Sequence, residues 1–175
     1  SIEIDLSNYP LNHLPANKFK ALGMYLARQQ RVEVLVLRNC GLTKVQTDSL
    51  RKFFELLPRM RQLHTLDLSH NGLSYSAEQV HCVFAYLSQL PKLNKLVFMD
   101  SDWKETVPAF FDQLKTMPFL RMYEKSDRDP ADPVPTNSVA FLNEAETHAL
   151  IEAIRTNRKI AIRYLGPINE RSDED

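Results

Sequence analysis

The stretch Leu63–Leu73 reads LHTLDLSHNGL and matches the pattern L-x-x-L-x-L-x-x-N-x-L at every fixed position. Val32–Leu42 (VEVLVLRNCGL) and Leu93–Trp103 (LNKLVFMDSDW) fit the same pattern with tolerated substitutions, and Ile4–Leu11 is a partial fourth copy. The fourth position of the pattern recurs at a nearly constant interval and is filled by Ile4, Leu35, Leu66 and Leu96. A motif that recurs at a fixed period of this length predicts a fold built from stacked repeats.

Each copy predicts a short strand followed by a tight turn. In Leu66–Leu68 a polar residue separates two leucines, which places both leucines on the same face of a strand. The residues after the strand suit a turn, in which Gly41 and Gly72 are free to adopt a positive φ. We expect Asn71 to hydrogen-bond the turn backbone, and Cys40 to fill the same slot as a small buried side chain.

The second half of each repeat predicts a helix. Thr47 and Ser76 are the expected N-caps, and Pro58, Pro91 and Pro118 lie where the helices end, just before the next strand. An apolar stripe at helical spacing follows each of the second, third and fourth strands. The stripes consist of Leu50, Phe53, Phe54 and Leu57, of Val80, Val83, Phe84, Leu87 and Leu90, and of Val107, Phe110, Phe111 and Leu114.

A strand and a full helix within each period resemble the ribonuclease-inhibitor-like class of leucine-rich-repeat proteins, over residues 1–125. The chain departs from the repeat consensus at Tyr9, Cys40 and Ser101, where asparagine is usual. The resemblance implies an α/β solenoid with a short parallel sheet on the concave side and helices on the convex side. It also implies that the chain works by presenting a surface.

The repeats are expected to start near residues 1, 32, 63, 93 and 120, within a single domain of residues 1–167. A fifth strand is predicted at Leu120–Tyr123, followed by an exposed loop at Ser126–Pro135 that holds three prolines and three aspartates. A helix over Asn143–Asn157, introduced by a capping box, and a final strand at Lys159–Leu165 form a degenerate C-terminal cap at 136–167. Residues 168–175 are expected to be a disordered acidic tail.

Composition argues against several classes of function. The formal net charge is zero and the pI is near 6.9, whereas nucleic-acid or acidic-membrane binding usually needs a basic excess. No apolar run approaches the ~18 residues of a membrane span. Ser1–Asp5 lacks the features of a signal peptide, and Cys40 and Cys82 do not form the framework of a secreted disulfide-rich protein. We therefore expect a protein of a reducing compartment such as the cytoplasm.

The sequence carries no signal for catalysis, a cofactor or a metal. The five histidines have no metal-ligand spacing: His13, His64, His70, His81 and His148. His81 and Cys82 are neighbours on a predicted helix, so their side chains do not face each other. The chain has only four glycines and no glycine-rich phosphate-binding loop, and no G-x-S-x-G motif occurs. The chain is therefore expected not to be an enzyme.

The strand residues that point away from the helices are expected to form four columns across the concave face. The first column contains Glu3, Val34, Thr65, Lys95 and Met122, and the second contains Asp5, Val36, Asp67, Val97 and Glu124. The third contains Ser7, Arg38, Ser69 and Met99, and the fourth contains Asn8, Asn39, His70 and Asp100. The residues predicted to bind a partner are Val34, Val36, Arg38, Asp67, His70, Val97, Met99, Asp100 and Trp103.

Apolar side chains on an open sheet face are the main reason for predicting a binding surface there. The three valines and Met99 lie at positions that should face solvent, which favours a partner-binding face. Arg38 and Asp67 would add orientation through charged hydrogen bonds. The alternative is that strands favour β-branched residues in general. Trp103 fills a leucine slot, which favours a core role, but at the edge of the turn it would serve as an anchor for a partner.

The predicted function is a non-catalytic module that binds another protein. Five short strands form a face of only ~300 Å², whereas a standard interface buries ~800 Å² per partner, so the loops at 38–43, 69–74, 100–104 or 126–135 would have to contribute. The module would be monomeric alone and act as an adaptor or as an inhibitor of a partner enzyme. The chain also resembles the leucine-rich effectors that intracellular bacterial pathogens inject into the host cytosol. The alternative is a targeting module of a larger or associated enzyme.

Overall fold

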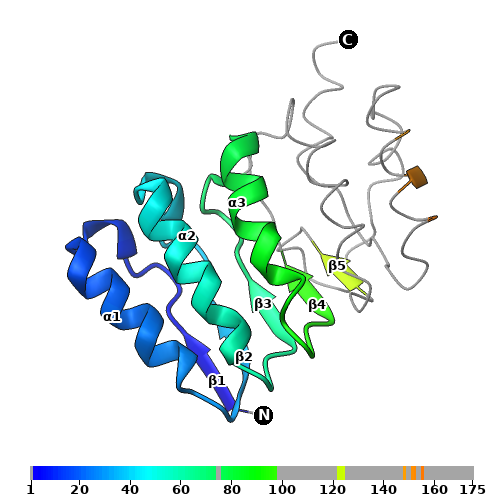
Figure 1. The fold of residues 1–175 in the computed structure, drawn as a ribbon, viewed down its shortest axis with the longest axis horizontal. Helices are drawn as coiled ribbons and strands as arrows, with labels where there is room; N and C mark the ends of the chain where they lie inside the picture. The colour runs from blue at the N-terminus through cyan, green and yellow to red at the C-terminus, as the bar shows by residue number, and fades with distance from the viewer. Residues whose placement is uncertain are drawn as a thin grey trace.

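The computed structural model describes residues 2–73 and 76–97, the backbone of residues 122–124, and residues 148, 151, 152 and 155. In this part of the chain, strands and helices alternate to form an α/β fold (Figure 1). The strands are β1 (Ile2–Asp5), β2 (Val32–Val36), β3 (Thr65–Asp67), β4 (Lys95–Val97) and β5 (Met122–Glu124). The α-helices are α1 (Ala16–Ala27), α2 (Thr47–Leu56) and α3 (Ala77–Leu87), and the short 3-10 helices are η1 (Leu11–His13), η2 (Leu42–Lys44) and η3 (Leu57–Arg59).

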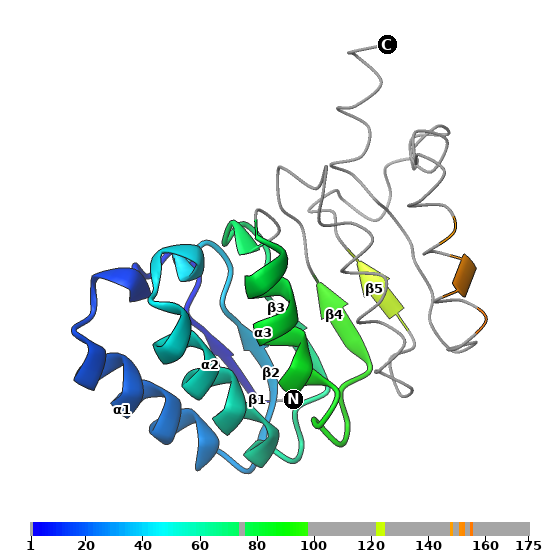
Figure 2. The same cartoon turned by 45° about the horizontal axis from the view of Figure 1, so that its top comes forward.

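The strands pair in parallel and in sequence order, β1-β2-β3-β4-β5, within one sheet (Figure 2). The register confirms the first two predicted columns. Along the first, Glu3 pairs with Val34, Val34 with Thr65, Thr65 with Lys95, and Lys95 with Met122. Along the second, Asp5 pairs with Val36, Val36 with Asp67, Asp67 with Val97, and Val97 with Glu124.

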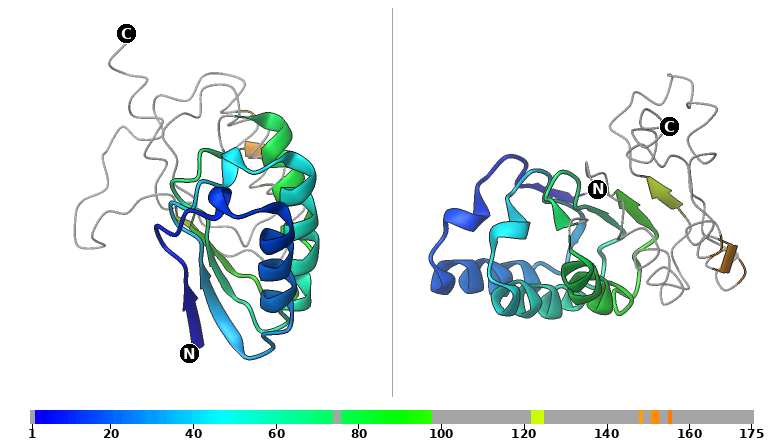
Figure 3. Two further views of the ribbon diagram at one scale, coloured as in Figure 1. Left: turned by 90° about the vertical axis from the view of Figure 1, so that its left-hand side faces the viewer. Right: turned by 90° about the horizontal axis from the view of Figure 1, so that it is seen from above.

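The three α-helices lie side by side on one face of the sheet and leave the opposite face to the strands (Figure 3). The apolar stripes predicted for α2 and α3, from Leu50 to Leu57 and from Val80 to Leu90, are buried at every position against the sheet and the neighbouring helices. The third predicted stripe, at 107–114, lies outside the described residues. This arrangement of helices and strands is the one that the repeat pattern predicts.

Helix α1 is the helix that the repeat pattern predicts after the first strand, although no apolar stripe was assigned to it from the sequence. Its buried face is formed by Phe19, Gly23 and Leu26, which share one side of a helix, so the apolar spacing was present in the sequence. Gly23 allows α1 to approach α2 closely: a Cβ at this position would lie 3.2 Å from the Phe53 ring. The first repeat therefore has the same strand-and-helix composition as the others.

One of the two predicted N-caps is confirmed and the other is wrong. Ser76 precedes α3, and its hydroxyl accepts a hydrogen bond from the Gln79 N–H at 3.3 Å. Thr47 is instead the first residue of α2, and Gln46 occupies the N-cap position without a side-chain bond. Asp48 in the first turn complements the positive end of this helix.

Aromatic side chains join the first two repeats. The Phe19 and Phe53 rings are stacked with centroids 4.8 Å apart, and Phe53 meets Phe54 edge-on at 5.4 Å. All three side chains are at most 2% exposed. The cluster lies between α1 and α2, so it fixes the distance between adjacent helices in the row.

Asn71 hydrogen-bonds the backbone of its turn, as predicted, and it also bonds the turn of the preceding repeat. Its Oδ1 accepts hydrogen bonds from the N–H groups of Cys40 at 2.9 Å and Leu42 at 3.3 Å, both in the preceding repeat. Its Nδ2 donates to the carbonyl oxygens of Leu37 at 2.8 Å and Leu68 at 3.0 Å. The two turn glycines have the predicted positive φ, 72° at each: Gly41 and Gly72.

Cys40 occupies the equivalent slot of its own repeat and is fully buried, as predicted. Its thiol donates to the carbonyl oxygen of Leu6 at 3.1 Å, which ties the turn to the first repeat. Burial raises the pKa of this thiol from 9.0 to about 11. The folded state therefore retains a proton that the unfolded chain loses near pH 9.

This proton makes the stability depend on alkaline pH. Between pH 9 and 11 the unfolded chain binds fewer protons at Cys40, so raising the pH favours unfolding, and we expect a loss of about 2 kcal/mol through this thiol. Urea titrations of wild type and Cys40→Ser at pH 8 and pH 10.5 measure the difference. Cys82→Ser is the comparison: burial also raises the pKa of this half-buried thiol, so its replacement should remove a smaller part of the pH dependence than Cys40→Ser does. Identical pH dependence in wild type and Cys40→Ser would contradict the prediction.

The fifth strand is present at Met122–Glu124, slightly later than predicted. Within the stretch where the sequence predicts a C-terminal helix, His148, Ile151, Glu152 and Arg155 are helical. The rest of the predicted cap at 136–167 and the predicted tail at 168–175 lie outside the described residues, as does the loop at Ser126–Pro135.

Candidate protein-binding face

The face of the sheet opposite the helices carries the predicted binding residues of β2, β3 and β4. Val34, Val36 and Val97 are half-buried there. Their partners on β3 are polar, since Val34 pairs with Thr65 while Val36 and Val97 both pair with Asp67. Apolar and charged residues therefore alternate along the second column, and the centre of the face combines apolar area with charge.

Arg38 of the third column and Asp67 of the second column form an ion pair between adjacent repeats. The Arg38 Nε lies 3.2 Å from the Asp67 Oδ2. The Arg38 side chain is 30% exposed and that of Asp67 is 12% exposed, so Arg38 is the member that a partner can contact. Asp67 holds the guanidinium in place, which reduces the entropy that Arg38 would lose on binding.

Asp5 and Asp67 share a structural role in the turns, which the predicted columns did not include. The Asp67 Oδ1 accepts a hydrogen bond from the Ser69 N–H at 2.9 Å, and the Asp5 Oδ1 accepts the same bond from Ser7 at 2.8 Å. The Ser7 hydroxyl also donates to Asp5 and holds the pKa of that carboxyl below its usual value. Ser69, which the third predicted column places on the open face, is fully buried. The recurrence of Asp-Leu-Ser at both positions was the signal for these turns.

The predicted fourth column lies at the rim of the face, where each strand has entered its turn. Asn8, Asn39 and His70 all adopt left-handed backbone conformations, with φ of 65°, 53° and 59°. The Asn39 Nδ2 donates to the Asn8 Oδ1 at 2.8 Å, so side chains of this column contact each other across repeats. All three are exposed, which places His70 at the edge of the sheet beside the loop that follows β3.

Three of the predicted partner-binding residues lie outside the described residues: Met99, Asp100 and Trp103. The structure brings together the other six, from β2, β3, β4 and the turns after β2 and β3. Of the loops expected to extend the face, 38–43 is described in full and 69–74 up to residue 73. The described part of the site is thus the centre of the face and one of its edges.

Groups capable of acid–base or metal chemistry are sparse in the described part of the chain. His64 lies with its Nδ1 2.7 Å from the Thr65 hydroxyl and its Nε2 4.0 Å from a Glu33 carboxylate oxygen. No group of three or more His, Cys, Asp or Glu side chains is placed to hold a metal ion among these residues. None of the helices described here is long and apolar enough to cross a membrane.

Three features define a leucine-rich-repeat fold. The strands are parallel and pair in the register of the repeats, the helices form a row on one face, and buried Asn71 and Cys40 hold the turns. Solved structures share it. Over 99% of this chain, the leucine-rich-repeat-containing protein LegL7 from Legionella pneumophila superposes with a TM-score of 0.62 and 17% identity, and the match covers 53% of LegL7. The chain therefore spans about half the length of that protein.

Two further structures have similar folds. Actin-binding site 2 of leiomodin-1 matches 99% of this chain and 88% of its own length, with a TM-score of 0.54 and 13% identity. The C-terminal domain of tropomodulin from Caenorhabditis elegans matches 92% of this chain and 90% of its own length, with a TM-score of 0.52 and 9% identity. At these identities the likeness shows the fold alone. No protein-family model and no curated protein sequence matches the chain.

Proposed function

We propose that this chain is a non-catalytic module that binds another protein through the concave face of its sheet and the loops at the strand C-terminal ends. The observation that carries the proposal is the centre of that face. Val36 and Val97 flank Asp67 in one column, and the Arg38–Asp67 ion pair lies beside them. Apolar area next to an oriented guanidinium is the composition of a protein interface core.

The geometry of the face also supports a protein as the ligand. Its residues come from three successive strands, and each column runs across the repeats rather than into a cavity. An open surface of this kind suits a second protein better than a small molecule, which needs an enclosed pocket. A region of leiomodin-1 with a similar fold is an actin-binding site, so this fold serves to bind a protein in that case.

Within this class, the proposed role is that of an adaptor or of an inhibitor that covers the active site of a partner enzyme. The proposed setting is a reducing compartment, which the two free thiols of Cys40 and Cys82 support. If the chain is a translocated bacterial effector, that compartment is the host cytosol; the fold occurs in a Legionella pneumophila protein, and it occurs in animal proteins as well.

Affinity capture with a charged double variant tests the binding face. The bait proteins are wild type and Val36→Glu with Val97→Glu, each incubated with host-cell and bacterial lysates and analysed by quantitative mass spectrometry. Two carboxylates in the apolar centre should weaken capture of the specific partner at least about tenfold, because a buried unpaired charge in an interface is costly. Ala21→Glu with Ala85→Glu is the matched control, since both alanines are exposed on helices of the opposite side.

The control separates face-specific binding from a general effect of charge. Partners retained by wild type and by the helix-face control, but lost with the concave-face variant, support the proposal. Loss of folding in the variant, seen by circular dichroism, would show that the two valines are needed for the core, and Val36→Thr with Val97→Thr then provides the folded test. Equal capture by all folded baits would exclude the concave face as the interface.

A further inference from the structure

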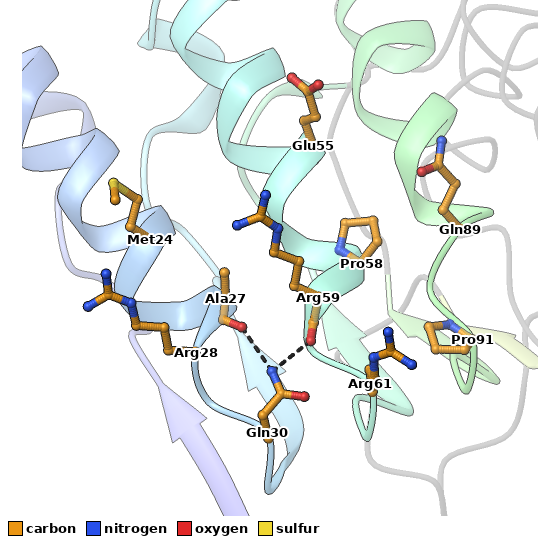
Figure 4. Close-up of a pocket in the computed structure, with 10 residues that line it drawn as sticks. All are labelled: Met24, Ala27, Arg28, Gln30, Glu55, Pro58, Arg59, Arg61, Gln89 and Pro91. Atoms are coloured by element: carbon orange, nitrogen blue, oxygen red, sulfur yellow. Dashed lines mark hydrogen bonds between the residues drawn. The ribbon is translucent and has the colours of Figure 1, made fainter.

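A second surface lies at the opposite edge of the sheet, where the helices end and the strands begin. A hollow of about 860 Å³ runs there across the C-terminal ends of the helices (Figure 4). Its charged lining consists of three arginines and one glutamate: Arg28, Arg59, Arg61 and Glu55. The loops of the concave face follow the strands and therefore lie at the other edge, so the two surfaces are separate.

The charges of this hollow are not balanced within the described part of the chain. Among those residues, no carboxylate forms an ion pair with Arg28, Arg59 or Arg61, and all three are exposed. The one lining carboxylate, on Glu55, lies 3.4 Å from an Arg51 Nη1 and is already paired. The hollow therefore presents three guanidinium groups that the carboxylates of these residues leave available to a ligand.

The lining repeats with the period of the fold. Arg28, Arg59 and Gln89 occupy equivalent places at the ends of successive helices, and they recur at the same interval as the strand leucines. A second set recurs in the same way: Gln30, Arg61 and Pro91. Neighbouring helix axes lie roughly 8–10 Å apart, so the hollow spans about 20 Å across three repeats. An extended chain of about six residues has this length.

The neutral lining suits a polypeptide. The Gln30 Nε2 donates to the carbonyl oxygens of Ala27 at 3.0 Å and Arg59 at 2.8 Å, so this side chain is held in place between two repeats (Figure 4). Its amide oxygen can accept a hydrogen bond from a peptide N–H group. Met24, 42% exposed, adds apolar area beside the arginines.

We propose that this hollow binds an extended acidic segment, about six residues long, of a partner protein. Guanidinium groups bind carboxylates through paired, directional hydrogen bonds, and three of them spread over two repeats select a ligand with carboxylates along its length. Cations near helix C-termini also interact with the helix dipole. The dipole explains why an arginine lies at the end of one helix. It does not explain why three arginines line one hollow without carboxylate partners among the described residues. Zero net charge over the whole chain favours an acidic protein segment over nucleic acid.

Fluorescence anisotropy with a labelled peptide of six alternating Asp and Glu residues tests the proposal on the full chain. The test variant combines Arg28→Gln, Arg59→Gln and Arg61→Gln. Its affinity for the peptide should fall at least about tenfold, and wild-type binding should weaken with added salt. The matched control changes three other exposed cations and has the same net charge: Lys18→Gln, Lys20→Gln and Lys44→Gln. Its affinity should stay within about twofold of wild type.

Two further measurements decide between the alternatives. Val36→Glu with Val97→Glu should bind the acidic peptide as wild type does, which would show that this surface is independent of the concave face. Inorganic polyphosphate is measured in parallel. Tighter binding of polyphosphate than of the peptide, lost in the arginine variant, would reassign the hollow to phosphate ligands and overturn the proposal. Equal loss of peptide binding in the lysine control, or no peptide binding by folded wild type, would also overturn it.

Discussion

Replacing Asn71 with alanine is expected to lower the free energy of unfolding by about 4 kcal/mol. The side chain is only 2% exposed and bonds backbone groups of two repeats. Its removal leaves the N–H groups of Cys40 and Leu42 without their acceptor in the interior, and each such orphaned group costs roughly 1–3 kcal/mol. Guanidinium titration followed by circular dichroism measures the change.

Asn94→Ala provides the control for this substitution. Asn94 is an exposed asparagine just before β4, so its replacement should change the free energy of unfolding by less than about 0.5 kcal/mol. A loss below about 1 kcal/mol for Asn71→Ala would contradict the prediction, since it would mean that water satisfies the turn as well as the side chain does. The difference between the two variants gives the contribution of the hydrogen bonds between repeats, because both variants lose a side-chain amide.

Replacing Phe53 with alanine is expected to cost about 4 kcal/mol, through loss of buried area and creation of a cavity. The ring is 2% exposed, stacks on Phe19 and contacts Phe54 edge-on. The gap cannot close easily, because Gly23 already brings α1 close to α2 at this point. Urea titration of wild type, Phe53→Ala and Phe53→Leu measures the effect.

The leucine variant tests the physical cause. Phe53→Leu retains most of the buried volume and should cost less than about half as much as Phe53→Ala. Equal losses for the two variants would show that ring stacking, rather than filled volume, is the main contribution. A loss near zero for Phe53→Ala would show that α1 and α2 move together to fill the space. In both cases the account of how adjacent repeats pack would be wrong.

Most of the fold was predictable because equivalent residues of successive repeats are separated by a nearly constant number of residues. The strand leucines recur at the same place in successive repeats, and the turn glycine recurs in two of them, so the register of β1 to β5 and the positive φ of Gly41 and Gly72 followed from spacing. The bounds of α1 were not predicted, because its buried face has fewer large apolar side chains, Phe19 and Leu26, than the buried faces of α2 and α3. Thr47 was a wrong cap because α2 begins at that residue rather than after it.

The candidate surfaces were predictable to different degrees. Alternation within a strand is enough to place Val34, Val36 and Val97 on one face of the sheet. It does not predict which side chains of neighbouring strands contact each other. The contact of Arg38 with Asp67 depends on two rotamers in different repeats, which no local pattern encodes. The basic hollow was missed entirely, because its arginines lie in separate connections and each one, taken alone, is an ordinary solvated residue at the end of a helix.

Each strand of the sheet pairs with the strand of the next repeat, and this has an evolutionary consequence. A tandem duplication of one whole period would give the new strand the same neighbours, turn and helix contacts as the existing ones, so it should be tolerated structurally. It would widen the sheet by about 4.8 Å and add one residue to each column. An insertion of a single residue within a strand would instead turn the following side chains of that strand to the opposite face of the sheet. The size of the surface can therefore change in steps of one repeat, whereas its alignment depends on keeping the register of each strand.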